Sequence, residues 1–344
     1  MSFLRKLEKT LAQGVQLVPE GIRHNVRCFA LARLHPKGGF CGRSNEPDLY
    51  YTAFALRTLR LVDGLTLAVT RAVLPWLIQT PRPKTLVDLY SYCQCLALLV
   101  DCADGAAKAA WQETRAYLAG TLADFCTPQG GYAAQRGASQ ASIYQTFLAL
   151  MCYDLLDQPP PNAPKIIGWL AQQQREDGGF ADVETVRLGG TNPTAAAIIS
   201  WQRLGDIPLH VVTGAIKFLR FVYIPHCGFR AHTRIPIPDL LSTFTALWIL
   251  WELNDLAFIN PDVLAQAVRA LQLPCGGFCG NFGETMMIDS HVETDGVQHR
   301  ADVEYSFYGL ACLALLALIK RHCRHHAIQP GKTKEEGNES CGEA

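Results

Sequence analysis

The sequence has no net charge and few charged residues for its length. Its 344 residues include 31 basic and 31 acidic side chains, so the formal net charge is zero, and charged residues make up 18%. Proteins that bind nucleic acid through its phosphates carry a basic surface, so this balance gives no electrostatic reason to expect nucleic acid as a partner. Hydrophobic residues make up 49%, which is typical of a folded chain with much buried surface and argues against overall disorder.

The sequence also lacks an uninterrupted apolar segment long enough to cross a membrane. The longest strongly apolar run covers residues 307–319, whereas a transmembrane helix needs about 20 residues, so we expect no transmembrane span. The N-terminus mixes Lys, Glu and Leu without an apolar core, so we expect no signal peptide. Several of the 13 cysteines lie inside apolar stretches, for example Cys93 and Cys312. We interpret them as reduced, buried thiols of a cytoplasmic protein.

A short phrase recurs along the chain: a glycine pair, or Cys-Gly, followed by an aromatic residue. The aromatic residues stand at 40, 132, 180, 229 and 278, so the last three intervals are 48, 49 and 49 residues. The first interval is 92 residues, close to twice 46, which indicates that one copy near residue 86 has lost the phrase. A fixed period of this length is typical of a repeat protein. The copies are Gly38-Gly39-Phe40, Gly130-Gly131-Tyr132, Gly178-Gly179-Phe180, Cys227-Gly228-Phe229 and Gly276-Gly277-Phe278.

Each phrase precedes a segment that is apolar nearly all round, and amphipathic segments such as 163–175 and 262–271 lie between these segments. We interpret each repeat as an outer amphipathic helix, a turn at the glycine pair and an inner apolar helix, because glycine adopts a positive φ easily and ends a helix. Six inner helices of this kind are better buried in a closed ring than on the open face of a solenoid. The predicted fold class is all-α, a closed (α/α)6 toroid of six helical hairpins.

The inner helices begin near capping or acidic residues, so we expect all of them to start at the same mouth of the ring. Asp48, Asp88, Asp239 and Asp302 are expected in first helical turns, where negative charge interacts favourably with the helix dipole. The predicted organisation is an N-terminal helical extension at 1–24, the toroid at 25–328 and a polar, disordered tail at 329–344.

With these repeats, the sequence resembles the prenyltransferase and squalene-cyclase superfamily over residues 25–325. It is most similar to the β subunits of protein farnesyl- and geranylgeranyltransferases, whose repeats carry a Gly-Gly-Phe turn before an inner helix. The resemblance implies the toroid fold, an isoprenoid lipid or diphosphate as ligand, and a helical protein partner. It does not fix the reaction, because one fold can host many chemistries.

The zinc ligands that the resemblance implies are not retained. The family binds zinc through an Asp-x-Cys pair and a His in a segment of the form Asp-x-x-His-Thr. Here Leu241 replaces the cysteine in the segment that begins at Asp239, and Tyr305 replaces the histidine in the segment that begins at Asp302. Leucine cannot bind zinc, and a zinc site needs three or four donors. The sequence therefore argues against zinc, and leaves Mg²⁺ bound with a diphosphate substrate as the open alternative.

Two further family features are missing. The histidine of the family's diphosphate-binding His-Gly-Gly-Tyr phrase is Leu188 here. The squalene-cyclase branch uses an Asp-x-Asp-Asp motif to protonate a polyene, and no such motif occurs in this sequence. The chain is also about half as long as those two-domain cyclases.

Several residues at the expected mouth remain candidates for chemistry. The resemblance places diphosphate contacts in the turn that contains Arg230, His232 and Arg234, and a solvated basic loop is the alternative. The segment 284–304 carries many acidic residues and histidines, which suit an acid–base pair or cation ligands, and a solvated loop is again the alternative. The candidate catalytic residues are Asp239, Asp302, Glu304 and Tyr305.

Aromatic residues are frequent on the inner helices. Such an interior suits an isoprenoid chain or its carbocation, and ordinary core packing is the alternative. The candidates for ligand contact are Tyr50, Tyr144, Trp248 and Tyr308.

The leading hypothesis is a prenyltransferase-like protein that binds an isoprenoid or its diphosphate in the toroid, with transferase activity that does not use zinc. One alternative is a non-catalytic toroid scaffold that binds a protein or a lipid, and a further one is a terpene-cyclase-like enzyme. The sequence leaves open whether the protein is an enzyme.

Overall fold

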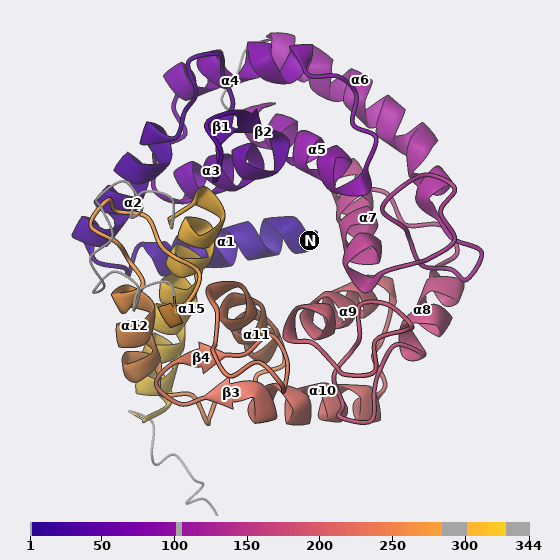
Figure 1. Ribbon diagram of the computed structural model, residues 1–344, viewed down its shortest axis with the longest axis vertical. Helices are drawn as coiled ribbons and strands as arrows, with labels where there is room; N and C mark the ends of the chain where they lie inside the picture. Colours follow the sequence, from indigo (N-terminus) through magenta and orange to yellow (C-terminus); the bar gives the residue numbers. More distant parts are fainter. Residues whose placement is uncertain (1, 101–104, 284–300, 328–344) are drawn as a thin grey trace, which may run out of the picture.

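The computed structural model describes residues 2–100, 105–283 and 301–327 and consists of two concentric sets of helices (Figure 1). The predicted polar tail and most of the acidic segment 284–304 lie outside the described residues. The outer helices are α2 (Glu20–Ala32), α4 (Leu67–Gln79), α6 (Gly105–Thr121), α8 (Ala163–Ala171), α10 (Leu209–Val222) and α12 (Pro261–Ala270). The inner helices are α3 (Leu49–Leu61), α5 (Leu86–Val100), α7 (Ile143–Leu156), α9 (Thr191–Leu204), α11 (Leu240–Glu252) and α15 (Val303–Ala327).

The inner helices form a closed circle. Each packs on the next along the chain, from α3 through α5, α7, α9 and α11 to α15, and α15 packs on α3 (Figure 1). Among the described residues, strands are confined to two short hairpins, β1 (Phe40–Cys41) with β2 (Pro47–Asp48) and β3 (Tyr223–Ile224) with β4 (Gly228–Phe229), and a 3₁₀ turn, η1 (Leu122–Phe125), follows α6. This arrangement confirms the predicted all-α toroid of six helical hairpins.

Four of the glycine turns, at Gly38, Gly130, Gly178 and Gly276, pack against the outer helix of a neighbouring hairpin. Gly276 has a φ of +92°, which side chains rarely adopt, and a Cβ added there would lie 2.5 Å from the carbonyl oxygen of Asn25 on α2. The turn of the last hairpin therefore packs on the outer helix of the first, and glycine is required both by its φ and by the close contact. This contact helps to close the ring.

The aromatic residue of each phrase is fully buried, with an exposed fraction of 0% in all five copies. Its backbone N–H donates to a Ser or Thr hydroxyl on the following inner helix, which satisfies a buried donor. The pairs are Phe40 with Thr52, Tyr132 with Thr146, Phe180 with Thr194, Phe229 with Thr243 and Phe278 with Ser306, at 2.8–3.1 Å. In the hairpin that lacks the phrase, the inner helix α5 begins after Thr85, and the buried Leu89 occupies the hydroxyl position.

Aspartates are the N-caps of three inner helices. The sequence analysis expected these aspartates inside the first helical turn, which begins one residue later. Asp48, Asp239 and Asp302 each accept a hydrogen bond from the backbone N–H three residues later. Asp88 does lie in the first turn of α5, where it interacts with Thr85. The inner helices thus start at one end of the ring, as predicted.

The N-terminal helix α1 (Phe3–Val15) extends into the ring from the rim between α2 and α15, and its N-terminal end lies near the centre in Figure 1. It crosses the end of the ring at which the inner helices terminate. Its buried face includes Leu7, Leu11 and Val15. A Cβ on Gly14 would overlap the carbonyl group of Ala314, so α1 packs tightly against α15.

Polar contacts hold α1 to the last turns of three inner helices. The backbone N–H of Leu4 donates to Asp154 Oδ2 of α7 at 3.0 Å, and Arg60 Nε of α3 lies 2.9 Å from Glu8 Oε1. Lys6 pairs with Glu252, the last residue of α11. These contacts fix α1 across the ring.

The helix α15 contains the longest apolar segment of the described chain. By length and composition alone, Val303–Cys323 could span a membrane, but 72% of that window is buried inside the ring. Burial on all sides is what an inner helix of the toroid requires, so its hydropathy is explained by its place in the fold. The cysteines of the described segments are free thiols, and a cytoplasmic location stays a prediction.

Candidate active site

The inner helices enclose an apolar cavity of about 480 Å³. Its walls come from all six inner helices, and Phe3, Leu4 and Leu7 of α1 line it at the far end. The structure brings together here the four aromatic residues that the sequence analysis selected for ligand contact, Tyr50, Tyr144, Trp248 and Tyr308.

Ring contacts order the aromatic wall. Phe54 and Phe244 each lie within 6 Å of both Phe307 and Tyr308, centroid to centroid, mostly edge to face. At the α1 end, Phe3 makes an edge contact with Trp248 at 5.9 Å. The faces of aromatic rings carry a negative quadrupole that attracts cations.

A carboxyl–phenol pair lies at the mouth of the cavity. The Tyr50 hydroxyl donates to Glu304 Oε1 at 2.7 Å, and Tyr50 itself lines the cavity. Burial raises the pKa of Glu304, while the hydrogen bond from Tyr50 offsets part of that shift. Burial likewise raises the pKa of Tyr50. Glu304 therefore holds a proton to a higher pH than an exposed glutamate does.

Asp302 and Tyr305 belong to a second group at the same mouth. Asp302, only 1% exposed, accepts from the Tyr305 N–H and from Arg43 Nε, each at 2.8 Å. The Arg43 guanidinium also lies 5.4 Å from the centroid of the Tyr305 ring. Because Arg43 follows β1 and Asp302 precedes α15, this ion pair joins the first hairpin to the last.

A family model, the prenyltransferase alpha-alpha toroid domain, matches residues 9–92, 82–192 and 196–335. The chain belongs to this toroid family. No curated protein matches the sequence.

Solved structures of the same fold include two with a bound isoprenoid. A Candida albicans protein geranylgeranyltransferase-I complexed with GGPP is 16% identical, with 75% of this chain and 88% of that chain covered and a TM-score of 0.54. A type II terpene cyclase from Scytonema in complex with its substrate, geranylgeranyl dihydroxybenzoate, is 13% identical, with 92% and 99% covered and a TM-score of 0.50. At these identities the likeness shows the shared fold alone.

The described residues at the expected zinc position do not fit a zinc ion. Leu241 has no donor atom, and its side chain lines the cavity instead. Asp239 accepts from both the N–H and the hydroxyl of Ser242, at 2.8 and 2.7 Å, and burial raises its pKa, opposed by these hydrogen bonds. Within the described segments, no three His, Cys, Asp or Glu side chains group as a metal site would need. These residues therefore give no basis for a zinc-dependent reaction at this position.

The predicted basic turn lies in the loop after β4. The Arg230 guanidinium donates to the carbonyls of Phe221, Val222 and Thr233. The N–H of Arg234 lies 3.2 Å from Nδ1 of His232. Arg230 therefore orders this loop, and a diphosphate contact by the turn, with or without Mg²⁺, stays a prediction.

Sequence reasoning missed three polar residues that line the cavity. Asp182 accepts from the Ser142 hydroxyl and the Tyr144 N–H at the mouth, Gln94 accepts from the Tyr90 hydroxyl, and Arg57 projects from the middle of α3. An arginine at the centre of an apolar inner helix was the available signal.

Proposed function

We propose that the central cavity binds an isoprenoid chain. The observation that supports this most strongly is the cavity itself, which is apolar, lined by aromatic rings and enclosed by the ring and α1. Its volume of about 480 Å³ falls in the range of small-molecule sites, about 300–1,000 Å³. Leu241 adds apolar surface where the family has a zinc-binding cysteine.

Two structures of the same fold were solved with geranylgeranyl ligands, the Candida albicans transferase and the Scytonema cyclase. We transfer to this chain only the expectation that a branched polyene fits such a ring. If the protein is an enzyme, we propose a reaction at this polyprenyl ligand that uses its own acid–base groups. A scaffold that holds the lipid without turnover is the alternative.

The Glu304–Tyr50 pair favours a terpene-cyclase-like reaction as the second candidate. A carboxyl with a raised pKa keeps its proton to a higher pH than usual and can deliver it to a carbon–carbon double bond. The resulting carboxylate can take a proton back when the carbocation forms an alkene. Aromatic faces along the wall would stabilise the cation between these steps. Asp239 and Asp302 act as helix caps, so Glu304 is our first choice among the four candidate catalytic residues.

Titration with geranylgeraniol and geranylgeranyl diphosphate tests the proposal, with tryptophan fluorescence as the signal because Trp248 lines the cavity. Ala196→Phe, which fills the cavity from α9, should weaken binding by about tenfold or more. Ala109→Phe on the exposed face of α6 is the matched control and should bind like the wild type. No binding of either compound by the folded wild type would contradict the proposal. Bound zinc at one ion per chain would contradict the zinc-free site.

A further inference from the structure

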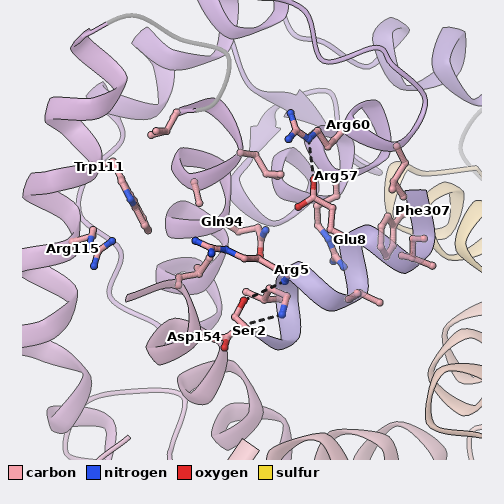
Figure 2. Close-up of a pocket in the computed structure, with 18 residues that line it drawn as sticks. Ser2, Arg5, Glu8, Arg57, Arg60, Gln94, Trp111, Arg115, Asp154 and Phe307 are labelled. Atoms are coloured by element: carbon pink, nitrogen blue, oxygen red, sulfur yellow. Dashed lines mark hydrogen bonds and ion pairs between the residues drawn. The ribbon is translucent and has the colours of Figure 1, made fainter. Parts of the chain in front are cut away.

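A second, polar pocket of about 290 Å³ lies beside α1 (Figure 2). Among the described residues, four arginines and two carboxylates line it. The arginines are Arg5, Arg57, Arg60 and Arg115, and the carboxylates are Glu8 and Asp154.

Both carboxylates of this pocket are already engaged. Glu8 pairs with Arg60, and Asp154 accepts from the Leu4 N–H and pairs with Arg203 at 3.2 Å. Arg115 donates to the carbonyl of Leu156 at 2.7 Å. Among the described lining residues, the arginines therefore outnumber the carboxylates that could balance them.

Arg57 has no hydrogen bond or ion pair with any part of the chain that the structure describes. Its guanidinium carbon lies 3.9 Å from the centroid of the Phe307 ring and 5.4 Å from that of Phe54. Arg57 is half-buried, and the five N–H donors of its guanidinium are open to a ligand in the pocket.

Arg57 stands where the two pockets meet. Arg57, Gln94, Leu4 and Leu7 line both of them, so these residues form the boundary between the apolar cavity and the arginine-rich pocket. Gln94 accepts from Tyr90 through Oε1, which leaves its amide N–H groups as donors at the same boundary.

The opposite end of the cavity is less favourable for an anion. Asp182 and Tyr50, the partner of Glu304, line the mouth, and the nearby Arg43 is already paired with Asp302. The Asp182 carboxylate there would repel a phosphate, whereas Arg57 at the boundary is a cation with no ion-pair partner among the described residues.

We infer that Arg57 and Gln94 form an anion-binding site, and that an isoprenoid ligand lies with its phosphate or diphosphate head toward α1 and its chain toward the mouth. This inference rests on the proposed function and adds the orientation of the ligand. The head occupies the boundary at Arg57 and extends into the arginine-rich pocket. The Asp154 and Glu8 ion pairs fix the walls of that pocket.

The test compares geranylgeranyl diphosphate with the neutral geranylgeraniol by calorimetry. The wild type should bind the diphosphate at least about tenfold more tightly, since hydrogen bonds to charged groups are worth that much. Arg57→Met keeps the length of the side chain and removes its charge. It should abolish this preference and leave geranylgeraniol binding within about twofold of the wild type.

Two control variants make the outcome decisive. Arg71→Met on the exposed outer helix α4 controls for net charge and should keep the preference. Arg234→Ala tests a head group at the mouth, and loss of the preference there in place of Arg57→Met would overturn the inference. Equal weakening of both ligands by Arg57→Met would also overturn it, since Arg57 would then only build the wall. In both cases the proposed function would stand. If the wild type bound neither ligand, both would fail.

Discussion

The two ends of the ring are built in different ways. At the end where the inner helices begin, the same parts recur in hairpin after hairpin: a glycine turn, a buried aromatic residue and a Ser or Thr hydroxyl that accepts from its N–H. At the opposite end a single helix, α1, crosses the ring and is held by contacts that occur only once, to Asp154, Glu252 and Arg60.

The difference separates the residues that make the ring from those that make the site. The repeated end determines how hairpins pack and close the circle. At the other end, Phe3, Leu4 and Leu7 of α1 line the cavity, and Arg57 lies at its boundary with the arginine-rich pocket. Stability should therefore respond most to changes in the repeated parts, and ligand binding most to changes near α1.

The largest effect is expected at a repeated turn. Gly276→Ala places a Cβ against the Asn25 carbonyl at a φ of +92°, so the last hairpin must move away from α2. We expect a loss of about 4 kcal/mol in the free energy of unfolding, measured by urea denaturation. Gly137→Ala is the matched control, because Gly137 has a φ of +71° but no atom within 4 Å of an added Cβ. It should lose only about 1–2 kcal/mol. Equal losses would show that the close contact does not matter.

A smaller loss is expected when α1 is displaced. Gly14→Leu introduces a side chain into the contact with Ala314 and should destabilise the docked helix by about 2–3 kcal/mol. Hydrogen exchange should then accelerate in α1 while α7 and α11 stay protected. Gly21→Ala on α2, where an added Cβ meets nothing within 4 Å, should leave α1 protected. If α7 and α11 lost protection together with α1, the two ends would not be separable.

A single repeated hydrogen bond should contribute less. Thr194→Val keeps the shape of the side chain but leaves the N–H of Phe180 without its acceptor, and the expected loss is about 1–2 kcal/mol. Thr213→Val, whose hydroxyl makes a local bond on an exposed helix surface, should change stability by less than about 0.5 kcal/mol. Thermal unfolding of both variants checks this, and equal melting temperatures would contradict it.

The smallest effect is a pH dependence at the mouth. Because burial raises the pKa of Glu304 above its ordinary value of 4.5, the folded state binds this proton more tightly than the unfolded state. Wild-type stability should therefore fall as the pH rises above 4.5 and through the raised pKa. Glu304→Gln cannot bind this proton, so its stability does not change with pH for this reason. Its melting temperature relative to the wild type should therefore increase from pH 4.5 to neutral pH. A difference that stays constant with pH would contradict the raised pKa.

The repeated end could be predicted from the sequence because its signal is local and periodic. The glycine pair, the aromatic residue and the cap recur at a fixed spacing, and together they indicated the hairpins and the closed ring. Tyr50, Tyr144, Trp248 and Tyr308 could also be chosen, because they lie on the inner helices, although other aromatic residues of these helices, such as Tyr153 and Trp201, do not line the cavity.

The features that could not be predicted from the sequence depend on contacts between segments that lie far apart in the chain. The sequence of residues 3–15 does not predict that this amphipathic helix crosses the ring, because its partners Asp154 and Glu252 lie far along the chain. The pairing of Arg43 with Asp302 joins the first hairpin to the last, and no local sequence pattern indicates it either. For Arg230 the residue type suggested an anion contact, whereas loop geometry turns its guanidinium toward backbone carbonyls.

The central claim is that the apolar cavity holds an isoprenoid. The most direct measurement is mass spectrometry of lipids extracted from the purified protein after incubation with a mixture of polyprenyl alcohols and diphosphates. We expect about one isoprenoid per wild-type chain and little or none for the folded Ala196→Phe variant. An empty wild-type protein, or equal lipid in both proteins, would contradict it.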